Sequence, residues 1–582
     1  MVKIKEHVNN SKFMIILGLL LFSIILIFPF FIAGQLGVHS DWSFHAARVQ
    51  QIYLNLKHGE FFTFIGTNTF HNVGNGNFLF YPTVFLYPWA LLEFVLKPIE
   101  AYLVYAWLLL FVTMLVSYFC MFSYSEGNNL QSIFFAIVYT IAPYHLYLIF
   151  QNYVLGEAQA YTFLPIVFLG IYKLLYKDKF ITLAIGMSLV AYCHYVSLFI
   201  AGEVLFAIVL VYFFVMKCNF KKVLLLLIKA VLLFGLLTIW QFIPLLTDCW
   251  KQGLFTPLSG FIIIPSMTNL IINSFNNQVS NQGGLGILLI LTLFFGWNWV
   301  KKDSIDKTVW LSGITLTILI TNVFPHNLFK NTIFNVIQFT YRYTDFAIVF
   351  LSIICAEGLY RYINSDTKFT VLKSSLLLLS ILLLYAGSIT NIYERNANHN
   401  NSVEVLSHPA KSYKTLRPDN DSPVILNNHN YNYQFSYAAL FGETDYFPMQ
   451  AYYQKESIIN HIIYINNSKK QITPIASGNK LTYKLSLNNN ATVDIPALAF
   501  KHTTLRINGE GTKYHISKRG TIVVNLKKGK YQLTVSYQPP IIYYVCFTIC
   551  LLTWGCLLII TLFKKSIFNF KSINNTNFIT TH

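Results

Sequence analysis

Charged residues are scarce in this chain of 582 residues: Asp, Glu, Lys and Arg together make up 11% of it. Soluble domains carry about 25% charged residues, so the composition excludes an ordinary soluble enzyme. Hydrophobic residues make up 55% and aromatic residues 17%, and the mean hydropathy is +0.50. The sequence therefore predicts a polytopic membrane protein.

Acidic residues are scarcer than basic ones, at 24 against 42, which gives a formal net charge of +18. In a membrane protein, such an excess usually holds cytoplasmic loops in place. Topology thus explains the charge, and we expect no nucleic-acid partner.

Cysteine is missing where a disulfide framework would need it. The eight cysteines lie in or beside apolar stretches, and the long polar region 390–538 has none. This distribution gives no support to a disulfide scaffold, a CxxC zinc site or a redox pair.

Twelve apolar stretches predict helices that cross a bilayer, each about 20 residues long. They are 13–34, 101–122, 131–150, 159–176, 180–198, 199–216, 223–246, 285–300, 308–323, 344–361, 370–389 and 541–563. The first is too long for a signal-peptide core and lacks a small-residue cleavage site after it. We therefore expect an uncleaved first span.

The further apolar stretch 78–96 is ambiguous, and charge decides its placement. If it lies in the outer interface as a bent, re-entrant pair, the basic clusters of the later loops all face the cytoplasm, as the positive-inside rule requires. These clusters are Lys173/Lys177/Lys179, Lys217/Lys221/Lys222, Lys301/Lys302/Lys307, Arg361/Lys368 and Lys564/Lys565. Pro82, Pro88 and Pro98 favour the bent arrangement, because proline interrupts helices. We expect a multi-pass cell-membrane protein with cytoplasmic termini.

The polar region 390–538 lies outside the membrane in this topology, as does the loop 35–100. Its later part alternates apolar and polar residues with a period of two, as in 481–487 and 531–537, and turn signals such as Asn508-Gly509 separate the runs. This pattern predicts a small antiparallel β-sandwich. We expect a transmembrane domain at 1–389, an extracytoplasmic domain at 390–538, and a final span with a cytoplasmic tail at 539–582.

The first outer loop carries a charged stripe. A helix that starts near Asp41 and runs to Leu56 would place Asp41, His45 and Arg48 on one side, at spacings of four and three. An adjoining apolar stripe would let this helix lie flat on the outer interface. Asp41 could serve as a general base or only as a helix cap. His45 and Arg48 could contact substrate or only be solvated at the interface.

Other polar residues follow on the same side. His71 and Tyr81 flank a Gly/Asn-rich loop whose amides could approach a ligand, although plain turn chemistry explains it as well. His145, Glu157 and His194 lie at outer helix ends and could contact substrate. With Asp41 they could form a metal site, but the sequence does not establish their proximity. A helix-dipole role for Glu157 and structural roles for the histidines are the alternatives.

Arg342 lies at the outer mouth of an apolar stretch, shortly after Gln338. A charge near a bilayer is costly and usually marks a functional site. Its planar guanidinium could hold a phosphate with two hydrogen bonds, while Tyr341 and Tyr343 pack against a polyprenyl chain. The alternative is an interfacial anchor that pairs with Asp345.

Taken in order, these residues resemble the GT-C superfamily of membrane glycosyltransferases, and most closely the bacterial YfhO-type and 6-pyruvoyl-tetrahydropterin-synthase-related membrane proteins. The motifs that carry the resemblance are Asp41 with His45 and Arg48, Gly76 to Pro82, Pro143 to His145 with Glu157, His194, Gln338 to Arg342, and Asp445 to Pro448.

The resemblance implies a GT-C fold, a polyprenyl-phosphate-linked sugar as donor, inversion at the anomeric carbon, and Asp41 as the catalytic carboxylate. No DxD or ExD pair accompanies Asp41, so the sequence does not support a divalent-metal cofactor, and no other cofactor is predicted. Nothing in the residues supports pterin chemistry.

We therefore expect a glycosyltransferase of the cell envelope that moves a sugar from a polyprenyl-phosphate donor to a glycan, teichoic acid, lipid or protein acceptor. Asp41 would take a proton from the acceptor, and Arg342, with Arg48, would stabilise the leaving phosphate. A transporter or flippase of envelope lipids or polysaccharide is the alternative, which would predict internal repeats and charges deep in broken helices. A third alternative is a scaffold that displays the sandwich.

Overall fold

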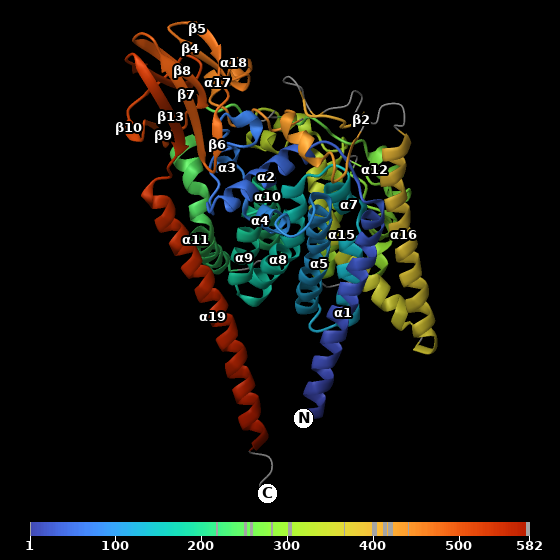
Figure 1. Cartoon of the computed structure of the whole chain (residues 1–582). Coiled ribbons are helices and arrows are strands. Elements are labelled where there is room, and N and C mark those ends of the chain that lie inside the picture. Colours follow the sequence, from blue (N-terminus) through green and yellow to red (C-terminus); the bar gives the residue numbers. More distant parts are fainter. Residues whose placement is uncertain are drawn as a thin grey trace.

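The computed structural model consists of a helical body that carries a β-sandwich at one end (Figure 1). It describes residues 2–216, 219–249, 253–256, 260–280, 283–300, 305–365, 367–398, 404–410, 416, 423–439 and 441–577. The basic residues Lys217, Lys301 and Lys302 lie outside this set. The first helix begins, and the last helix ends, at the side of the body away from the sandwich.

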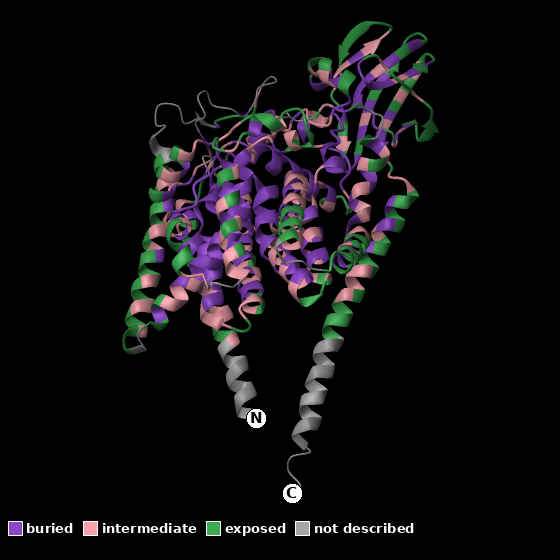
Figure 2. Cartoon of the chain, turned by 180° about the vertical axis from the view of Figure 1, so that it is seen from behind, coloured by how far each residue is buried: buried purple, intermediate pink, exposed green. Residues whose placement is uncertain are grey.

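Eight helices within the described residues are long and apolar enough to cross a membrane. They are α1 (Val2–Ala33), α5 (Pro98–Tyr124), α8 (Leu155–Lys177), α10 (Tyr195–Met216), α11 (Phe220–Pro244), α15 (Thr344–Asn364), α16 (Thr370–Asn398) and α19 (Ile541–Asn577). In the apolar 18-residue stretch of α8 and of α15, 72% of the residues are buried, against 11% in that of α19. The body therefore has a packed centre and peripheral helices that offer apolar surface to lipid (Figure 2).

The other four expected spans are helical but shorter or bent, so the described part of the chain contains fewer than twelve full-length spans. The stretch 131–150 is two helices, α6 (Asn129–Thr140) and α7 (Pro143–Phe150), at 48° to each other. Pro143 opens α7 because proline fits the first turn of a helix and not its interior. The remaining three are α9 (Ile181–Ala191), α13 (Ile287–Phe295) and α14 (Ile305–Ile320).

The segment 78–96 forms no membrane-length helix. It contains the short helices α3 (Asn77–Phe80) and α4 (Tyr87–Leu92), joined by a 3-10 turn, η2 (Val84–Leu86). Pro88 sits in the first turn of α4, and Pro98 in the first turn of α5. The prolines thus break the apolar run into pieces, as expected.

Helix α2 (Trp42–Lys57) differs from the expected interfacial helix. Val49 and Ile52 are fully buried, and so is Arg48 on the charged side. The cover comes from the polar region, because Trp42 Nε1 donates a hydrogen bond to Gln434 Oε1 at 2.8 Å. Just before α2, strand β1 (Leu36–Val38) pairs with β3 (Val424–Leu426), which also pairs with β2 (Glu404–Val405). The helix is therefore an inner element and does not lie flat on the surface.

The sandwich has two five-stranded antiparallel sheets, in the strand orders β10-β9-β13-β7-β6 and β11-β12-β8-β4-β5. The strands are β4 (Ile462–Ile465), β5 (Ser468–Gln471), β6 (Ile475–Ser477), β7 (Lys480–Leu487), β8 (Ala491–Leu498), β9 (Thr503–Ile507), β10 (Glu510–Thr512), β11 (His515–Ile516), β12 (Thr521–Leu526) and β13 (Gly529–Tyr537). Alternate residues such as Leu481, Tyr483, Leu533 and Val535 fill the core between the sheets. The expected helical membrane protein with a β-sandwich near its C-terminus is confirmed.

A buried carboxylate joins the sandwich to the helical body. Helix α11 continues into a π turn, η3 (Leu245–Cys249), where Asp248 is completely buried. Asp248 Oδ2 accepts hydrogen bonds from the Tyr537 hydroxyl at 2.9 Å and from Thr247 Oγ1 at 2.7 Å, and it lies 2.9 Å from His502 Nδ1. The end of a membrane helix is thereby tied to two parts of the sandwich.

Candidate active site

Asp41 immediately precedes α2 and is half-buried. Its side chain caps no backbone N–H of the helix, so a role as a simple cap is wrong. Instead Ser40 Oγ donates to Asp41 Oδ1 at 3.3 Å, and the Asp41 backbone N–H donates to the Asn152 carbonyl at 3.3 Å. Burial raises the pKa of Asp41 to about 6, and the positive charge of Arg342 partly opposes this rise. A carboxylate with this pKa is suited to accept a proton near neutral pH.

Arg342 lies in the 3-10 turn η7 (Thr340–Tyr343), directly before α15, and is buried. Its Nη1 donates to the Ile337 carbonyl at 2.7 Å and to Gln338 Oε1 at 3.1 Å. Its Nε lies 3.3 Å from Glu157 Oε2. Nη2 makes no hydrogen bond to the described residues. The guanidinium is therefore fixed on two sides and keeps one donor group for a ligand.

Glu157 is the partner of Arg342, in place of the Asp345 that sequence proximity suggested. It lies in the first turn of α8, is 1% exposed, and accepts a hydrogen bond from the Tyr144 hydroxyl at 2.6 Å. Asp345 is equally buried and interacts with Glu157. Both carboxylate oxygens of Glu157 thus have protein partners, and one of them faces Arg342.

Arg48 holds the turn that follows α3. Its Nη2 donates to the Tyr81 and Pro82 carbonyls at 3.0 and 2.6 Å, and its guanidinium lies 4.7 Å from the centre of the Tyr81 ring. Burial lowers the pKa of Arg48 to about 10. The side chain is fully buried, so solvation at the interface is wrong as an explanation for it.

Tyr81 brings three of the expected residues together. Its ring lies 6.1 Å from that of His45 and 6.0 Å from that of His194, besides its contact with Arg48. A Cβ added at Gly156 would lie 2.5 Å from the Tyr81 hydroxyl, so this position leaves no room for a side chain. Tyr81 therefore links the α2 residues to the start of α8, next to Glu157.

His45 and His194 are both buried. The ring nitrogens of His45 have no hydrogen-bond partner among the described residues, and burial holds the pKa of His45 well below its usual value. His194 Nδ1 lies 2.9 Å from Ser197 Oγ. Both histidines thus belong to the Tyr81 cluster, and the structure does not expose them to solvent.

His71 and His145 contact residues outside the Tyr81 cluster. His145 Nδ1 lies 2.7 Å from the Thr140 carbonyl, and its ring stacks on Tyr161 at 4.2 Å, which is a structural arrangement. His71 Nε2 lies 3.6 Å from Glu443 Oε1. Burial lowers the pKa of His71 to about 4 and raises that of Glu443 to about 8, so both side chains are neutral near pH 6. Among the described residues, no three His, Cys, Asp or Glu side chains are arranged to hold a metal ion.

Asp445 lies near the candidate site, although no role was predicted for it from the sequence. Its charge contributes to the raised pKa of Asp41, and burial raises its own pKa to about 6. Its loop is held on both sides. Asn75 Nδ2 donates to the Glu443 carbonyl at 2.8 Å, and the Tyr446 backbone N–H donates to the Phe255 carbonyl at 2.8 Å. The motif Asp445 to Pro448 was visible in the sequence, but no spacing rule connects it to Asp41.

A groove of about 770 Å³ lies in the membrane region next to η7. Apolar side chains of α8, α10, α14 and α15 make up most of its wall, including Ile171, Val204, Val211, Leu311 and Phe350. Val211 and Leu311 are about half exposed, so the groove opens on the surface that faces lipid.

One end of the groove reaches the turn that carries Arg342. Tyr343 lines the groove, and its hydroxyl donates to Glu203 Oε2 at 3.0 Å. The groove therefore ends at Tyr343, the residue that follows Arg342 in this turn, while the guanidinium of Arg342 points to Gln338 and Glu157.

Two membrane proteins are among the solved structures that match this chain. The arabinofuranosyltransferase AftD from Mycobacteria matches with a TM-score of 0.45 and 11% identity over 90% of this chain. The chain spans 40% of the length of that protein. ArnT from Cupriavidus metallidurans, solved bound to undecaprenyl phosphate, matches with a TM-score of 0.37 and 11% identity over 74% of this chain and 86% of its own.

No curated protein matches the sequence. A family model described as a 6-pyruvoyl-tetrahydropterin synthase related domain of membrane proteins matches residues 78–393, which is more than half of the chain. The chain therefore belongs to the 6-pyruvoyl-tetrahydropterin synthase related family of membrane proteins.

Proposed function

We propose that this protein is a membrane glycosyltransferase that moves a sugar from a polyprenyl-phosphate donor to a cell-envelope acceptor on the side that carries the sandwich. The observation that carries the proposal is that the charge of Arg342 acts on the carboxylate of Asp41, while the next residue, Tyr343, lines an apolar groove that opens to lipid. A substrate with a long apolar chain, a phosphate and a sugar would meet these three features in that order.

Asp41 acts as the general base. It takes the proton of an acceptor hydroxyl, whose oxygen forms a bond to the anomeric carbon of the donor sugar. The bond between that carbon and the phosphate oxygen breaks on the opposite face, so the configuration inverts. The pKa of Asp41, about 6, lets it be ionised near neutral pH and still accept a proton in the transition state.

Arg342 stabilises the leaving polyprenyl phosphate. Negative charge develops on the phosphate as the bond breaks, and a fixed cation stabilises such charge without having to reorganise. Glu157 and Gln338 hold the guanidinium in place, and Nη2 is free to donate to the phosphate. Glu157 also offsets part of the cost of burying the guanidinium charge.

The groove holds the polyprenyl chain. Its apolar wall and its opening to lipid suit a chain that enters sideways from the bilayer, with the head group at Tyr343 and Arg342. Ala207 lines the groove, whereas Leu210, on the same helix, does not.

The activity is tested with the donor that the cell supplies. Lipid-linked sugars are extracted from a deletion strain and incubated with the purified protein in nanodiscs, and released polyprenyl phosphate is measured by mass spectrometry. We expect one sugar-bearing lipid to accumulate in the strain and to be consumed by the wild-type protein but not by the Asp41→Asn variant. If no lipid-linked sugar accumulates and none is consumed, the proposal is wrong.

The groove is tested with Ala207→Trp, which places a large side chain in the lining. We expect the KM for a long-chain donor to rise about tenfold, equivalent to ~1.4 kcal/mol of lost binding, with little change for a short-chain analogue. Leu210→Trp is the matched control and should behave as wild type. Equal KM values for both variants would remove the groove as the chain site.

A further inference from the structure

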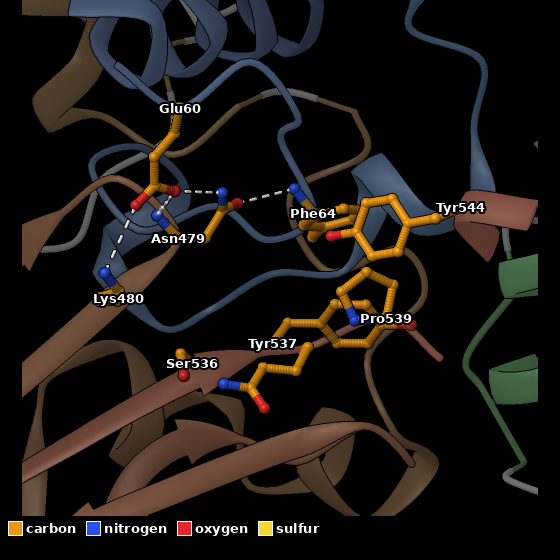
Figure 3. A pocket seen from close by; sticks show the side chains of 9 residues that line it. Glu60, Phe64, Asn479, Lys480, Ser536, Tyr537, Pro539 and Tyr544 are labelled. Atoms are coloured by element: carbon orange, nitrogen blue, oxygen red, sulfur yellow. Dashed lines mark hydrogen bonds and ion pairs between the residues drawn. The ribbon is translucent and has the colours of Figure 1, made fainter. Parts of the chain in front are cut away.

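A second pocket lies where the sandwich, the first outer loop and the last membrane helix meet (Figure 3). Its volume is about 410 Å³, within the range of small-molecule sites. We call it the junction pocket, and its lining consists of Glu60, Phe64, Asn479, Lys480, Ser536, Tyr537, Gln538, Pro539 and Tyr544. None of these residues belongs to the site around Asp41.

One wall of the junction pocket is a preformed polar network. Glu60 Oε2 accepts hydrogen bonds from the Asn479 backbone N–H at 3.0 Å and from Asn479 Nδ2 at 2.6 Å. Asn479 Oδ1 in turn accepts from the Phe64 backbone N–H at 2.8 Å, and Lys480 Nζ lies 3.6 Å from Glu60 Oε1. Gln538 is exposed, and it adds a side-chain amide to the lining. The wall therefore offers donors and acceptors in fixed positions.

The other wall is built from rings. Figure 3 shows Phe64, Tyr537, Pro539 and Tyr544 grouped opposite Glu60 and Lys480. Phe64 and Tyr537 pack with ring centres 5.5 Å apart, while Tyr544 is 45% exposed and leaves its ring accessible. Tyr544 lies in the first turn of α19, so the pocket sits at the surface of the membrane.

Charge and polarity together select the ligand. The carboxylate of Glu60 offsets the ammonium of Lys480, so the lining has no excess positive charge for a phosphate group. The polar wall would lose hydrogen bonds with water on binding an apolar chain and gain none in return. A neutral polyol with one apolar ring face satisfies both walls. We infer that the junction pocket binds a saccharide unit.

The position of the pocket indicates which saccharide this is, an assignment that rests on the proposed function. Asp41 precedes α2, and Glu60 follows its end. The 16 residues of α2 rise about 24 Å, at 1.5 Å per residue. One sugar cannot reach both ends, so the bound unit is a remote part of an extended acceptor glycan, and the acceptor is a polymer and not a small molecule.

The binding site is tested by saturation-transfer NMR on the full-length protein in nanodiscs. The probes are the methyl β-glycosides of glucose, galactose and N-acetylglucosamine, with glycerol 3-phosphate as the phosphate probe. We expect saturation transfer to at least one glycoside and none to glycerol 3-phosphate. Tyr544→Ala should weaken the signal up to about tenfold, because a ring contact contributes roughly 0.5–1.5 kcal/mol. Gln538→Ala should weaken it by a similar factor, because a hydrogen bond contributes about 0.5–1.5 kcal/mol.

Two exposed residues outside the junction pocket serve as controls. Tyr453→Ala and Gln532→Ala remove an exposed tyrosine and an exposed glutamine outside the pocket and should leave the signal unchanged. Transfer to glycerol 3-phosphate alone, transfer to no glycoside, or an equal signal from Tyr544→Ala would overturn the inference.

Steady-state kinetics test whether the junction pocket binds a remote part of the acceptor glycan. With a polymeric acceptor, Tyr544→Ala should raise the acceptor KM up to about tenfold and leave kcat near wild type, because the pocket binds without touching the reacting atoms. Asp41→Asn should lose transfer but bind the glycosides as wild type does. If the wild-type protein consumes no lipid-linked sugar, the proposed function fails while the binding result stands.

Discussion

The two carboxylates of the active site, Asp41 and Asp445, should be distinguishable by the pH dependence of sugar transfer. Burial raises the pKa of each to about 6, and the charge of Asp445 contributes to the rise at Asp41. If Asp41 is the base, kcat/KM follows its ionised fraction. Activity should then fall to about half at pH 6 and to about one tenth at pH 5, whereas an aspartate of ordinary pKa would lose about a tenth or less at pH 5.

The Asp445→Asn variant gives the decisive comparison. Burial is the main cause of the raised pKa of Asp41, and this variant removes a negative charge that adds to it. The loss of activity on the acid side should therefore move to lower pH, while the activity at neutral pH remains measurable. Asp41→Asn should have almost no activity at any pH. Asparagine is close in size to aspartate, so expression and folding should be near normal.

The assay measures initial rates of polyprenyl-phosphate release in nanodiscs between about pH 4.5 and 8. Each sample is returned to neutral pH and measured again, to separate titration from irreversible unfolding. A flat wild-type profile between pH 5 and 7 would show that the titration of Asp41 does not limit the rate. Loss of activity in Asp445→Asn with retention in Asp41→Asn would assign the base to Asp445 and refute the reasoning.

Three further predictions follow from other parts of the molecule. Arg342→Lys keeps the charge but loses the planar donor geometry, so it should retain partial transfer activity, and Arg342→Ala should retain very little. Wild-type rates in both variants, at matched protein levels, would show that Arg342 does not bind the phosphate. Burial raises the pKa of Glu443 to about 8, so the protein should lose stability as pH rises from about 4.5 to 8. Glu443→Gln should make the thermal midpoint depend less on pH, whereas Glu456→Gln, at an exposed position, should not. The same pH dependence of the midpoint in both variants would contradict the assignment. A reporter fused after Lys97 should be extracytoplasmic and one after Lys179 cytoplasmic, and reversal of both would invert the topology.

Much of the fold could be predicted from the sequence because its signals are local. Each expected span contains a helix, since a run of apolar side chains suffices to specify one in a membrane. The sandwich strands follow from a period of two, as in β7 and β13. The lengths of α9, α13 and α14 could not be predicted, because these helices are partly covered by neighbours and need not match the bilayer thickness.

The candidate site was harder to predict because its contacts join distant segments. Arg342 pairs with Glu157 from α8, although Asp345 lies only three residues away. Arg48 is on the predicted stripe, yet its guanidinium holds the Tyr81 turn within a closed interior. The presence of Asp445 beside the site depends on how the polar region covers α2, and no periodicity in the sequence encodes that packing.

The hydrogen bonds of Asp248 limit how parts of this protein can be exchanged with those of relatives. Because Asp248 lies at the end of α11 while Tyr537 and His502 lie in the sandwich, the sandwich is not an interchangeable module. A chimaera joined only at the ends of the polar region would leave a fully buried carboxylate facing foreign residues, which is strongly destabilising. Exchange between relatives should succeed only when the end of α11 is transferred with the sandwich, so the two segments are expected to evolve as one unit.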